Sequence, residues 1–183
     1  MKEDLIKLRK IIFEKSYQEG EFLLSSGKTS HYYFDLKHTT LSSEGIYLIS
    51  KLFYSLLPEN IKAVGGITMG ADPLSSGLSL YAYFQGRKVM AFYVRQQPKK
   101  HGTSKWIEGM GNLSKGDPVM ILEDVVTTGS SSLKAVRAAE EAGLHVKGIF
   151  SVVDREEGGS DFLKNQGISY QYLLSRTQIT HGV

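Results

Sequence analysis

The sequence has no cysteine, only four prolines and no apolar run long enough to cross a membrane. Without cysteine the chain cannot form a disulfide, a thiol nucleophile, an iron–sulfur cluster or a cysteine-bound zinc site, which fits a reducing compartment. The first residues enter an amphipathic pattern directly, without the basic start and apolar segment of an export signal. We therefore predict a cytoplasmic protein without a membrane-spanning segment.

Histidines at metal-ligand spacing are also lacking, because the five histidines are scattered along the chain. We expect no metal site built from protein side chains. The formal net charge of +3 is too small to indicate a nucleic-acid partner. Positive charge is instead local, since four cations and one histidine lie between Arg95 and Lys105 without an acid.

The length of 183 residues, with 41% hydrophobic and 22% charged residues, predicts a single globular domain over 1–183. Its first part, 1–40, forms a small separate unit. A helix is expected from the first residues to near Gly20, followed by short strands over 22–24 and 31–36. Another helix is expected from Ser42 or Ser43 to just before Pro58.

Strands and helices then alternate over residues 61–174, which predicts a core sheet that is mostly parallel with helices on both faces. The expected strands are 63–67, 88–94, 118–122, 146–153 and 168–173. The expected helices begin with Asp72 as cap and end at Gly86, run from about Ser130 to Ala142, and cover 161–166. Ligands of such sheets bind beyond the carboxyl ends of the strands.

The stretch ILEDVVTTGSSS, residues 121–132, joins an apolar strand to the start of a helix. Small hydroxylated residues around Gly129 meet the unpaired amides of a helix N-terminus there, which suits a phosphate. The carboxylates of Glu123 and Asp124 would repel a phosphate, so they suit the hydroxyls of an attached sugar. The stretch therefore predicts a ribose 5-phosphate site, and the alternative is a plain strand, turn and capped helix.

ILEDVVTTGSS looks like the phosphoribosyl pyrophosphate motif of type I phosphoribosyltransferases. This resemblance implies their fold, a central mostly parallel sheet flanked by helices with a small N-terminal hood over the base. It implies that Glu123 and Asp124 hold the ribose hydroxyls and that Asp124 takes part in catalysis. The resemblance gives the contacts to phosphoribosyl pyrophosphate in this stretch as Glu123, Asp124, Val125, Val126, Thr127, Thr128, Gly129, Ser130 and Ser131.

The basic segment YVRQQPKKHGTSKWIEGMG has many glycines and few apolar residues, which predicts a mobile loop that closes over a departing pyrophosphate. A solvated loop or a nucleic-acid contact is the alternative. The segment resembles the catalytic loop of orotate phosphoribosyltransferases, where Arg95, Lys99 and His101 match catalytic and pyrophosphate-binding positions. Gln96 stands where some members carry lysine. In that family the loop serves the neighbouring subunit of a homodimer.

Two further segments resemble the same family and concern the base. FLLSSGKTSHYYFDL, residues 22–36, is similar to its opening motif, with Ser25 at a position that is lysine in well-studied members. SVVDREEGG, residues 151–159, ends a strand with an arginine whose planar fork suits the carboxylate and carbonyls of orotate. The implied orotate contacts are Lys28, Tyr33, Phe34, Thr127 and Arg155. Tyr32 is expected in the core of the hairpin. The alternative to an orotate contact at Arg155 is a surface ion pair between Asp154 and Arg155.

GGITMGADPL, residues 65–74, leaves a strand through glycines and enters a helix. The resemblance makes Thr68, Met69, Gly70 and Ala71 the pyrophosphate loop, with backbone contact at Met69, which replaces a lysine of relatives.

The resemblance as a whole implies orotate phosphoribosyltransferase activity, which converts orotate and phosphoribosyl pyrophosphate into orotidine 5-phosphate and pyrophosphate during UMP biosynthesis. It also implies Mg²⁺ that arrives with the substrate, without direct protein ligands. Transfer to a purine or to uracil remains the nearer alternative. A regulator that binds phosphoribosyl pyrophosphate without catalysis is the more distant one.

Overall fold

The computed structural model describes residues 1–23, 29–97 and 106–181. The strands are β1 (Tyr17–Leu23), β2 (Thr29–Phe34), β3 (Ala63–Ile67), β4 (Met90–Val94), β5 (Ile107–Glu108), β6 (Pro118–Val126), β7 (His145–Asp154) and β8 (Tyr170–Ser175). The helices are α1 (Lys2–Lys15), α2 (Lys37–Thr40), α3 (Ser43–Leu56), α4 (Ala71–Phe84), α5 (Ser130–Glu141), α6 (Gly159–Asn165) and α7 (Arg176–His181), with a 3-10 turn η1 (Met110–Asn112).

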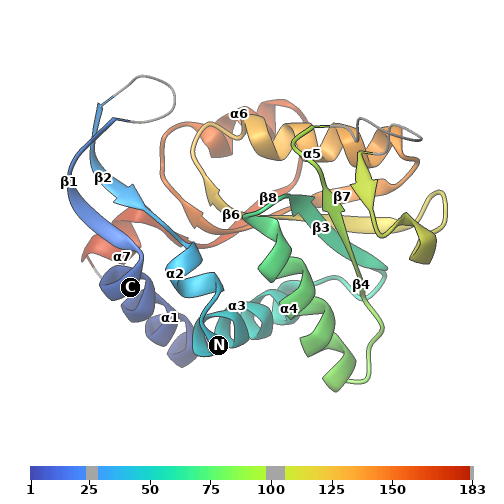
Figure 1. Ribbon diagram of the computed structural model, residues 1–183, viewed down its shortest axis with the longest axis horizontal. Helices are drawn as coiled ribbons and strands as arrows, with labels where there is room; N and C mark the ends of the chain where they lie inside the picture. The colour runs from blue at the N-terminus through green and yellow to red at the C-terminus, as the bar shows by residue number, and fades with distance from the viewer. Residues whose placement is uncertain (24–28, 98–105, 182–183) are drawn as a thin grey trace.

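Six strands form one sheet in the order β5-β4-β3-β6-β7-β8, and β1 and β2 form a separate antiparallel hairpin. Within the sheet only the edge strand β5 runs antiparallel to its neighbour. Figure 1 shows α3 and α4 on one face of the sheet, α5 on the other and the hairpin to one side. This arrangement confirms the predicted α/β fold with a mostly parallel sheet and helices on both faces.

The central strand β6 supplies side chains to two core layers, because consecutive residues of a strand point to opposite faces. Met120 and Leu122 pack in the cluster that includes the buried residues of α3 and α4. Val119 and Ile121 pack in the cluster that includes those of α5. A strand buried on both faces reads as a continuous apolar run, which is why 118–122 was recognisable in the sequence.

Three of the predicted helix ends match the structure, and one predicted cap does not. Ser42 is the N-cap of α3, and its Oγ accepts a hydrogen bond from the Gly45 amide at 3.2 Å. Gly86 and Gly143 follow α4 and α5 with positive φ angles of 79° and 90°, as expected for residues that terminate helices. The predicted cap at Asp72 is wrong, because α4 begins at Ala71 after Gly70 and Asp72 lies in its first turn.

The end of helix α1 and the end of strand β6 differ from the sequence-based prediction, and both differences matter for the site. Helix α1 ends at Lys15 instead of near Gly20, because Tyr17 pairs with Phe34 in the hairpin and their rings lie 5.2 Å apart. Strand β6 continues to Val126 and pairs with β7 along its full length. Glu123 and Asp124 therefore lie within a strand and not in the loop after it.

Four elements were not predicted, namely α2, β5, η1 and α7. Each has six residues or fewer, which is too short for hydrophobic periodicity to identify. None of the helices in the described part of the chain is long and apolar enough to cross a lipid bilayer.

Candidate active site

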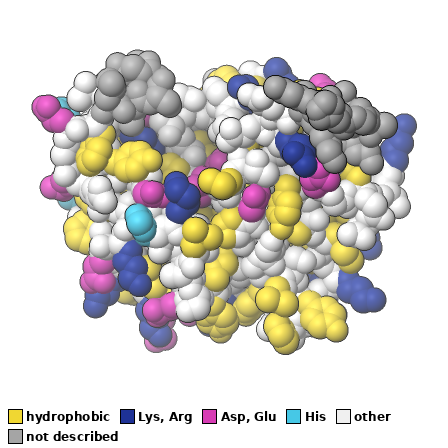
Figure 2. Space-filling model, viewed as in Figure 1, with side chains coloured by type: hydrophobic (Ala, Val, Ile, Leu, Met, Phe, Trp, Pro, Cys, Tyr) yellow, Lys and Arg dark blue, Asp and Glu magenta, His cyan; other side chains and the backbone are white. Residues whose placement is uncertain are grey.

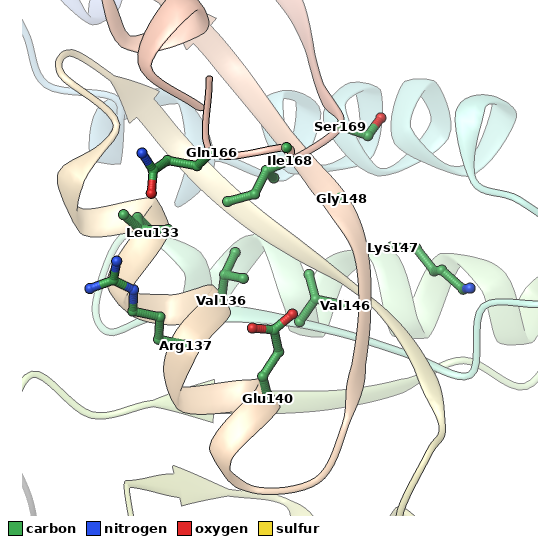
Figure 3. A pocket seen from close by; sticks show the side chains of 11 residues that line it. Leu133, Val136, Arg137, Glu140, Val146, Lys147, Gly148, Gln166, Ile168 and Ser169 are labelled. Atoms are coloured by element: carbon green, nitrogen blue, oxygen red, sulfur yellow. The ribbon is translucent and has the colours of Figure 1, made fainter. Parts of the chain in front are cut away.

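The carboxyl ends of the parallel strands β3, β4, β6 and β7 lie at the same edge of the sheet. The loops that leave these ends carry the predicted site residues, so the topology brings them together as expected. The hollow drawn in Figure 3 lies elsewhere, between α5, β7 and residues 166–169, with a volume of about 290 Å³. None of its lining residues belongs to the predicted site.

Glu123 is buried and points toward the first turn of α5. Its Oε2 accepts hydrogen bonds from Ser131 Oγ at 3.2 Å and from Ser132 Oγ at 2.9 Å. The neighbouring side chain of Asp124 lies on the opposite face of the strand and is half-buried, with Oδ1 accepting from the Val125 amide at 2.9 Å. The two carboxylates therefore have different surroundings, and Glu123 fixes β6 to the helix that follows it.

Both carboxyl groups are harder to ionise than usual. Burial raises the pKa of Glu123 to about 8, with a further contribution from the adjacent charge of Asp124. Burial also raises the pKa of Asp124. Adjacent carboxylates disfavour simultaneous ionisation, so burial and the charge of Asp124 act in the same direction on Glu123.

The raised pKa of Glu123 predicts a pH-dependent gain in stability on replacement by glutamine. Below its usual pKa of 4.5 the carboxyl is protonated in the folded and unfolded states, so its ionisation contributes nothing. As the pH rises from 4.5 to about 8, only the unfolded state loses the proton, which costs the fold about 1.4 kcal/mol per pH unit.

Glu123→Gln removes this cost and is therefore expected to stabilise the protein more at pH 8 than at pH 5. Urea unfolding at both pH values measures the difference. The same replacement at the exposed Glu141 is the control for the general effect of removing one carboxylate. An equal effect of Glu123→Gln on stability at both pH values would contradict a raised pKa of Glu123 in the folded protein.

The loop between β6 and α5 has the geometry of an anion-binding turn. Gly129 precedes the helix with a positive φ of 80°, a conformation that favours glycine. The first amides of α5 have no partner within the helix and add to the positive end of its dipole. Thr128 Oγ1 and Ser130 Oγ lie 3.2 Å apart at this turn. Amides and hydroxyls thus converge where the sequence predicted a phosphate.

The predicted pyrophosphate loop, residues 68–71, lies beside the carboxylate of Asp124. A Cβ atom added to Gly70 would lie 2.7 Å from Asp124 Oδ1, so only glycine allows this approach. The Thr68 amide donates to Val94 O at 2.9 Å, and Gln96 Nε2 donates to Thr68 O at 2.9 Å. Met69 is exposed. The loops after β3 and β4 are therefore tied to each other beside the end of β6.

The basic segment leaves and re-enters the sheet at neighbouring points, since the Arg95 amide donates to Trp106 O at 2.8 Å. The side chain of Arg95 pairs with Glu108 Oε1, with Nε at 2.8 Å and Nη2 at 2.6 Å. Lys99 and His101 lie outside the described residues. The roles predicted for these three cations at a pyrophosphate stay predictions.

The hairpin presents its residues alternately to the two sides. Phe34 is buried in the core against Tyr17 and Tyr32, whereas Tyr33 is exposed on the other face and lies against Phe22. The two residues predicted to contact the base thus point in opposite directions, and Phe34 does not face a solvent-accessible site. Both contacts stay predictions. Lys28 and Ser25 lie outside the described residues.

Arg155 and Asp154 at the end of β7 are buried, so the surface ion pair considered for them is wrong. Asp154 Oδ1 accepts from the Glu156 amide at 2.7 Å, whereas Arg155 Nη2 lies 2.8 Å from Glu157 Oε1. The guanidinium also lies 4.8 Å from the ring centroid of Tyr32. Arg155 therefore joins β7 to the hairpin, which is where the sequence predicted the base.

Sequence reasoning missed Gln96, Tyr32 and Glu157 as members of this region. In the sequence, Gln96 stands out only as a position that is lysine in some relatives, and Tyr32 fits the core of the hairpin. The alternation of the hairpin strand would have placed Tyr32 and Phe34 on one face. No local signal identified Glu157, whose partner Tyr32 lies 125 residues away in sequence.

Comparison with known structures first defines the class. The crystal structure of orotate phosphoribosyltransferase from Mycobacterium tuberculosis in complex with Fe(III) dicitrate matches with a TM-score of 0.83 and 34% identity, over 97% of this chain and 99% of that one. The same enzyme in complex with phosphoribosyl pyrophosphate matches with a TM-score of 0.78 and 31% identity, over 96% and 98%. The chain thus has the type I phosphoribosyltransferase fold.

Sequence comparison then defines the family. No protein-family model matches the chain. Orotate phosphoribosyltransferase from Aquifex aeolicus is 46% identical over 177 residues, which cover 94% of this chain and 96% of that protein. Orotate phosphoribosyltransferase from a Nostoc species is 41% identical over 169 residues, which cover 92% and 82%. The chain belongs to the orotate phosphoribosyltransferase family.

Proposed function

We propose that the protein transfers the ribose 5-phosphate of phosphoribosyl pyrophosphate to orotate and releases orotidine 5-phosphate and pyrophosphate. The observation that carries this proposal is the position of Asp124. Its carboxylate lies against Gly70 of the predicted pyrophosphate loop, and its strand leads into the predicted phosphate-binding turn at Gly129. One acid thus stands between two anion-binding loops, which fits a sugar that carries phosphate at one end and pyrophosphate at the other.

The reaction follows from this placement. As pyrophosphate leaves the anomeric carbon and the base nitrogen approaches, positive charge develops on the ribose ring. A carboxylate beside the ring stabilises that charge more than it stabilises the substrate. Asp124 takes this role, Glu123 orients the first turn of α5 and contributes to the ribose site, and the amides of residues 127–131 hold the 5-phosphate.

The departing pyrophosphate is held by the amides of residues 68–71 and by the basic segment. Arg95, Lys99 and His101 supply positive charge to it, and Lys99 or His101 donates a proton. The described residues contain no group of three or more acidic or histidine side chains placed to hold a metal ion. Mg²⁺ would be held mainly by oxygens of the substrate and would supply positive charge to the leaving group.

The assembly we propose is a cytoplasmic homodimer. Large apolar side chains are exposed on α3 and α4, among them Tyr47, Leu80, Tyr83 and Phe84, and Figure 2 shows hydrophobic side chains gathered on the lower part of this face. A second copy on this surface buries these side chains, and we propose that the two copies share the basic segment. The sedimentation mass of the purified chain tests this assembly.

A base-specificity assay tests the activity. Purified protein is incubated with Mg²⁺, phosphoribosyl pyrophosphate and, separately, orotate, uracil or hypoxanthine, and loss of each base is followed. We expect turnover of orotate alone, because Arg155 provides a planar cation for its carboxylate. Turnover of uracil or hypoxanthine in place of orotate would overturn the base assignment. Binding of phosphoribosyl pyrophosphate without turnover of any base would indicate a regulator.

A further inference from the structure

Arg155 is a buried cation whose hydrogen-bonding capacity is only partly used. Its side chain is 7% exposed, and Nη2 lies 2.8 Å from Glu157 Oε1 and 3.4 Å from Ser30 Oγ. Its Nε is buried without a hydrogen-bond partner. A guanidinium offers five N–H donors, and leaving one buried and unpaired costs free energy. The group can therefore take another acceptor.

Tyr32 connects the hairpin to this cation. Its ring centroid lies 4.8 Å from the guanidinium carbon of Arg155 and 5.2 Å from that of Arg176. Its hydroxyl donates to Glu157 Oε1 at 2.5 Å. The same oxygen of Glu157, Oε1, therefore accepts a hydrogen bond from Tyr32 and pairs with Arg155. This carboxylate supplies the negative charge next to the buried cation.

The two partners of the ion pair differ in their freedom to move. Arg155 follows directly on a central strand and is enclosed by the hairpin, whereas Glu157 lies in the loop before α6 with its side chain 35% exposed. Rotating the side chain of Glu157 out into solvent costs little desolvation free energy, because its carboxylate is already partly hydrated. Leaving Arg155 buried without an anion costs far more. Glu157 can therefore leave only when another anion takes its place.

We infer that Glu157 is an internal competitor that occupies, in the ligand-free protein, the position on Arg155 that the carboxylate of orotate takes on binding. This inference rests on the proposed function, in which Arg155 contacts orotate. Exchange of one carboxylate for another keeps the buried guanidinium paired throughout. A neutral base such as uracil brings no carboxylate and leaves the Arg155–Glu157 pair in place. Glu157 thus lowers the affinity for carboxylated bases specifically.

The test compares base binding by the parent protein and by Glu157→Gln, in the presence of Mg²⁺ and pyrophosphate. Glutamine keeps an acceptor oxygen for Tyr32 but removes the charge that competes with orotate. Because the charged group that competes for Arg155 is removed, we expect the Kd of orotate, measured by calorimetry, to fall about 10-fold. The Kd of uracil should stay within about twofold, since no carboxylate is exchanged.

Glu156→Gln is the matched control, because it removes the same charge one residue earlier. Glu156 accepts from the amide and Oγ of Thr177 at 2.9 and 2.6 Å and pairs with Arg176 at 3.7 Å, whereas Glu157 pairs with Arg155. The Kd of orotate for this variant should therefore stay near that of the parent. A similar tightening in both variants would show a general effect of charge and would overturn the inference.

Two further outcomes separate the inference from the proposed function. Unchanged or weaker orotate binding by both Glu157→Gln and Glu157→Ala would overturn the inference. Glu157 would then not compete with orotate, and weaker binding would mean that it positions Arg155 for the ligand. Arg155→Lys keeps the buried positive charge but loses the planar fork, and it should weaken orotate binding. Full affinity in this lysine variant would overturn both the Arg155 contact and the inference, whereas failure of the competition alone leaves orotate transfer standing.

Discussion

Asp124→Asn is expected to lower kcat about 100-fold, because it removes a preorganised charge at the reacting sugar. Asparagine has the same shape and can still accept the hydrogen bond from the Val125 amide, which Asp124 Oδ1 accepts at 2.9 Å. It cannot balance the positive charge that develops on the ribose ring. The loss should therefore fall mainly on kcat and less on the binding of phosphoribosyl pyrophosphate.

Steady-state kinetics with orotate and phosphoribosyl pyrophosphate measure this effect. Asp117→Asn is the matched control, since Asp117 lies just before the opposite end of the same strand, where Oδ2 accepts from the Ser114 amide at 2.7 Å. Its kcat should equal that of the parent. If Asp124→Asn retains a kcat close to that of the parent, the charge of Asp124 does not act on the reacting ring, and the central role given to it is wrong.

Residues 121–132 illustrate what local sequence can predict. An apolar strand, a turn around Gly129 and a helix beginning at Ser130 are all encoded within one continuous stretch, and the structure has them in that order. The same holds for β3, whose predicted bounds of 63–67 match the structure. Local sequence did not predict that β6 extends past Leu122 to Val126, because that length depends on pairing with β7.

Contacts between distant segments could not be predicted in this way. Gln96 reaches the carbonyl of Thr68 across 28 residues, and its amide was judged only against the lysine of relatives. Glu157 meets Tyr32 across 125 residues. Such contacts depend on how the hairpin packs against the sheet and on how the loops after β3 and β4 meet, and neither periodicity nor motif spacing contains that information. The missed contacts therefore join segments that only the tertiary structure brings together.

The two glycines of β3 show a second kind of dependence on tertiary structure. As an isolated dipeptide, Gly65-Gly66 is a weak signal of an anion-binding turn. In the fold, a Cβ atom added to Gly66 would lie 2.1 Å from Leu122 O and 2.7 Å from Ala71 Cβ. Glycine at this position thus allows β3, β6 and the start of α4 to approach closely, which holds the pyrophosphate loop beside Asp124.

Gly66→Ala is therefore expected to lower the free energy of unfolding by about 3 kcal/mol, the upper part of the usual range for overpacking a core. The contact at Leu122 is with backbone, so no side chain can rotate away and the strands themselves must separate. Urea unfolding measures the loss, and Gly111→Ala is the control because an added Cβ there meets nothing within 4 Å. Orotate turnover should fall as well, since separating β3 from β6 moves the pyrophosphate loop away from Asp124. A Gly66→Ala protein as stable and active as the Gly111→Ala protein would contradict the view that this close approach positions the site.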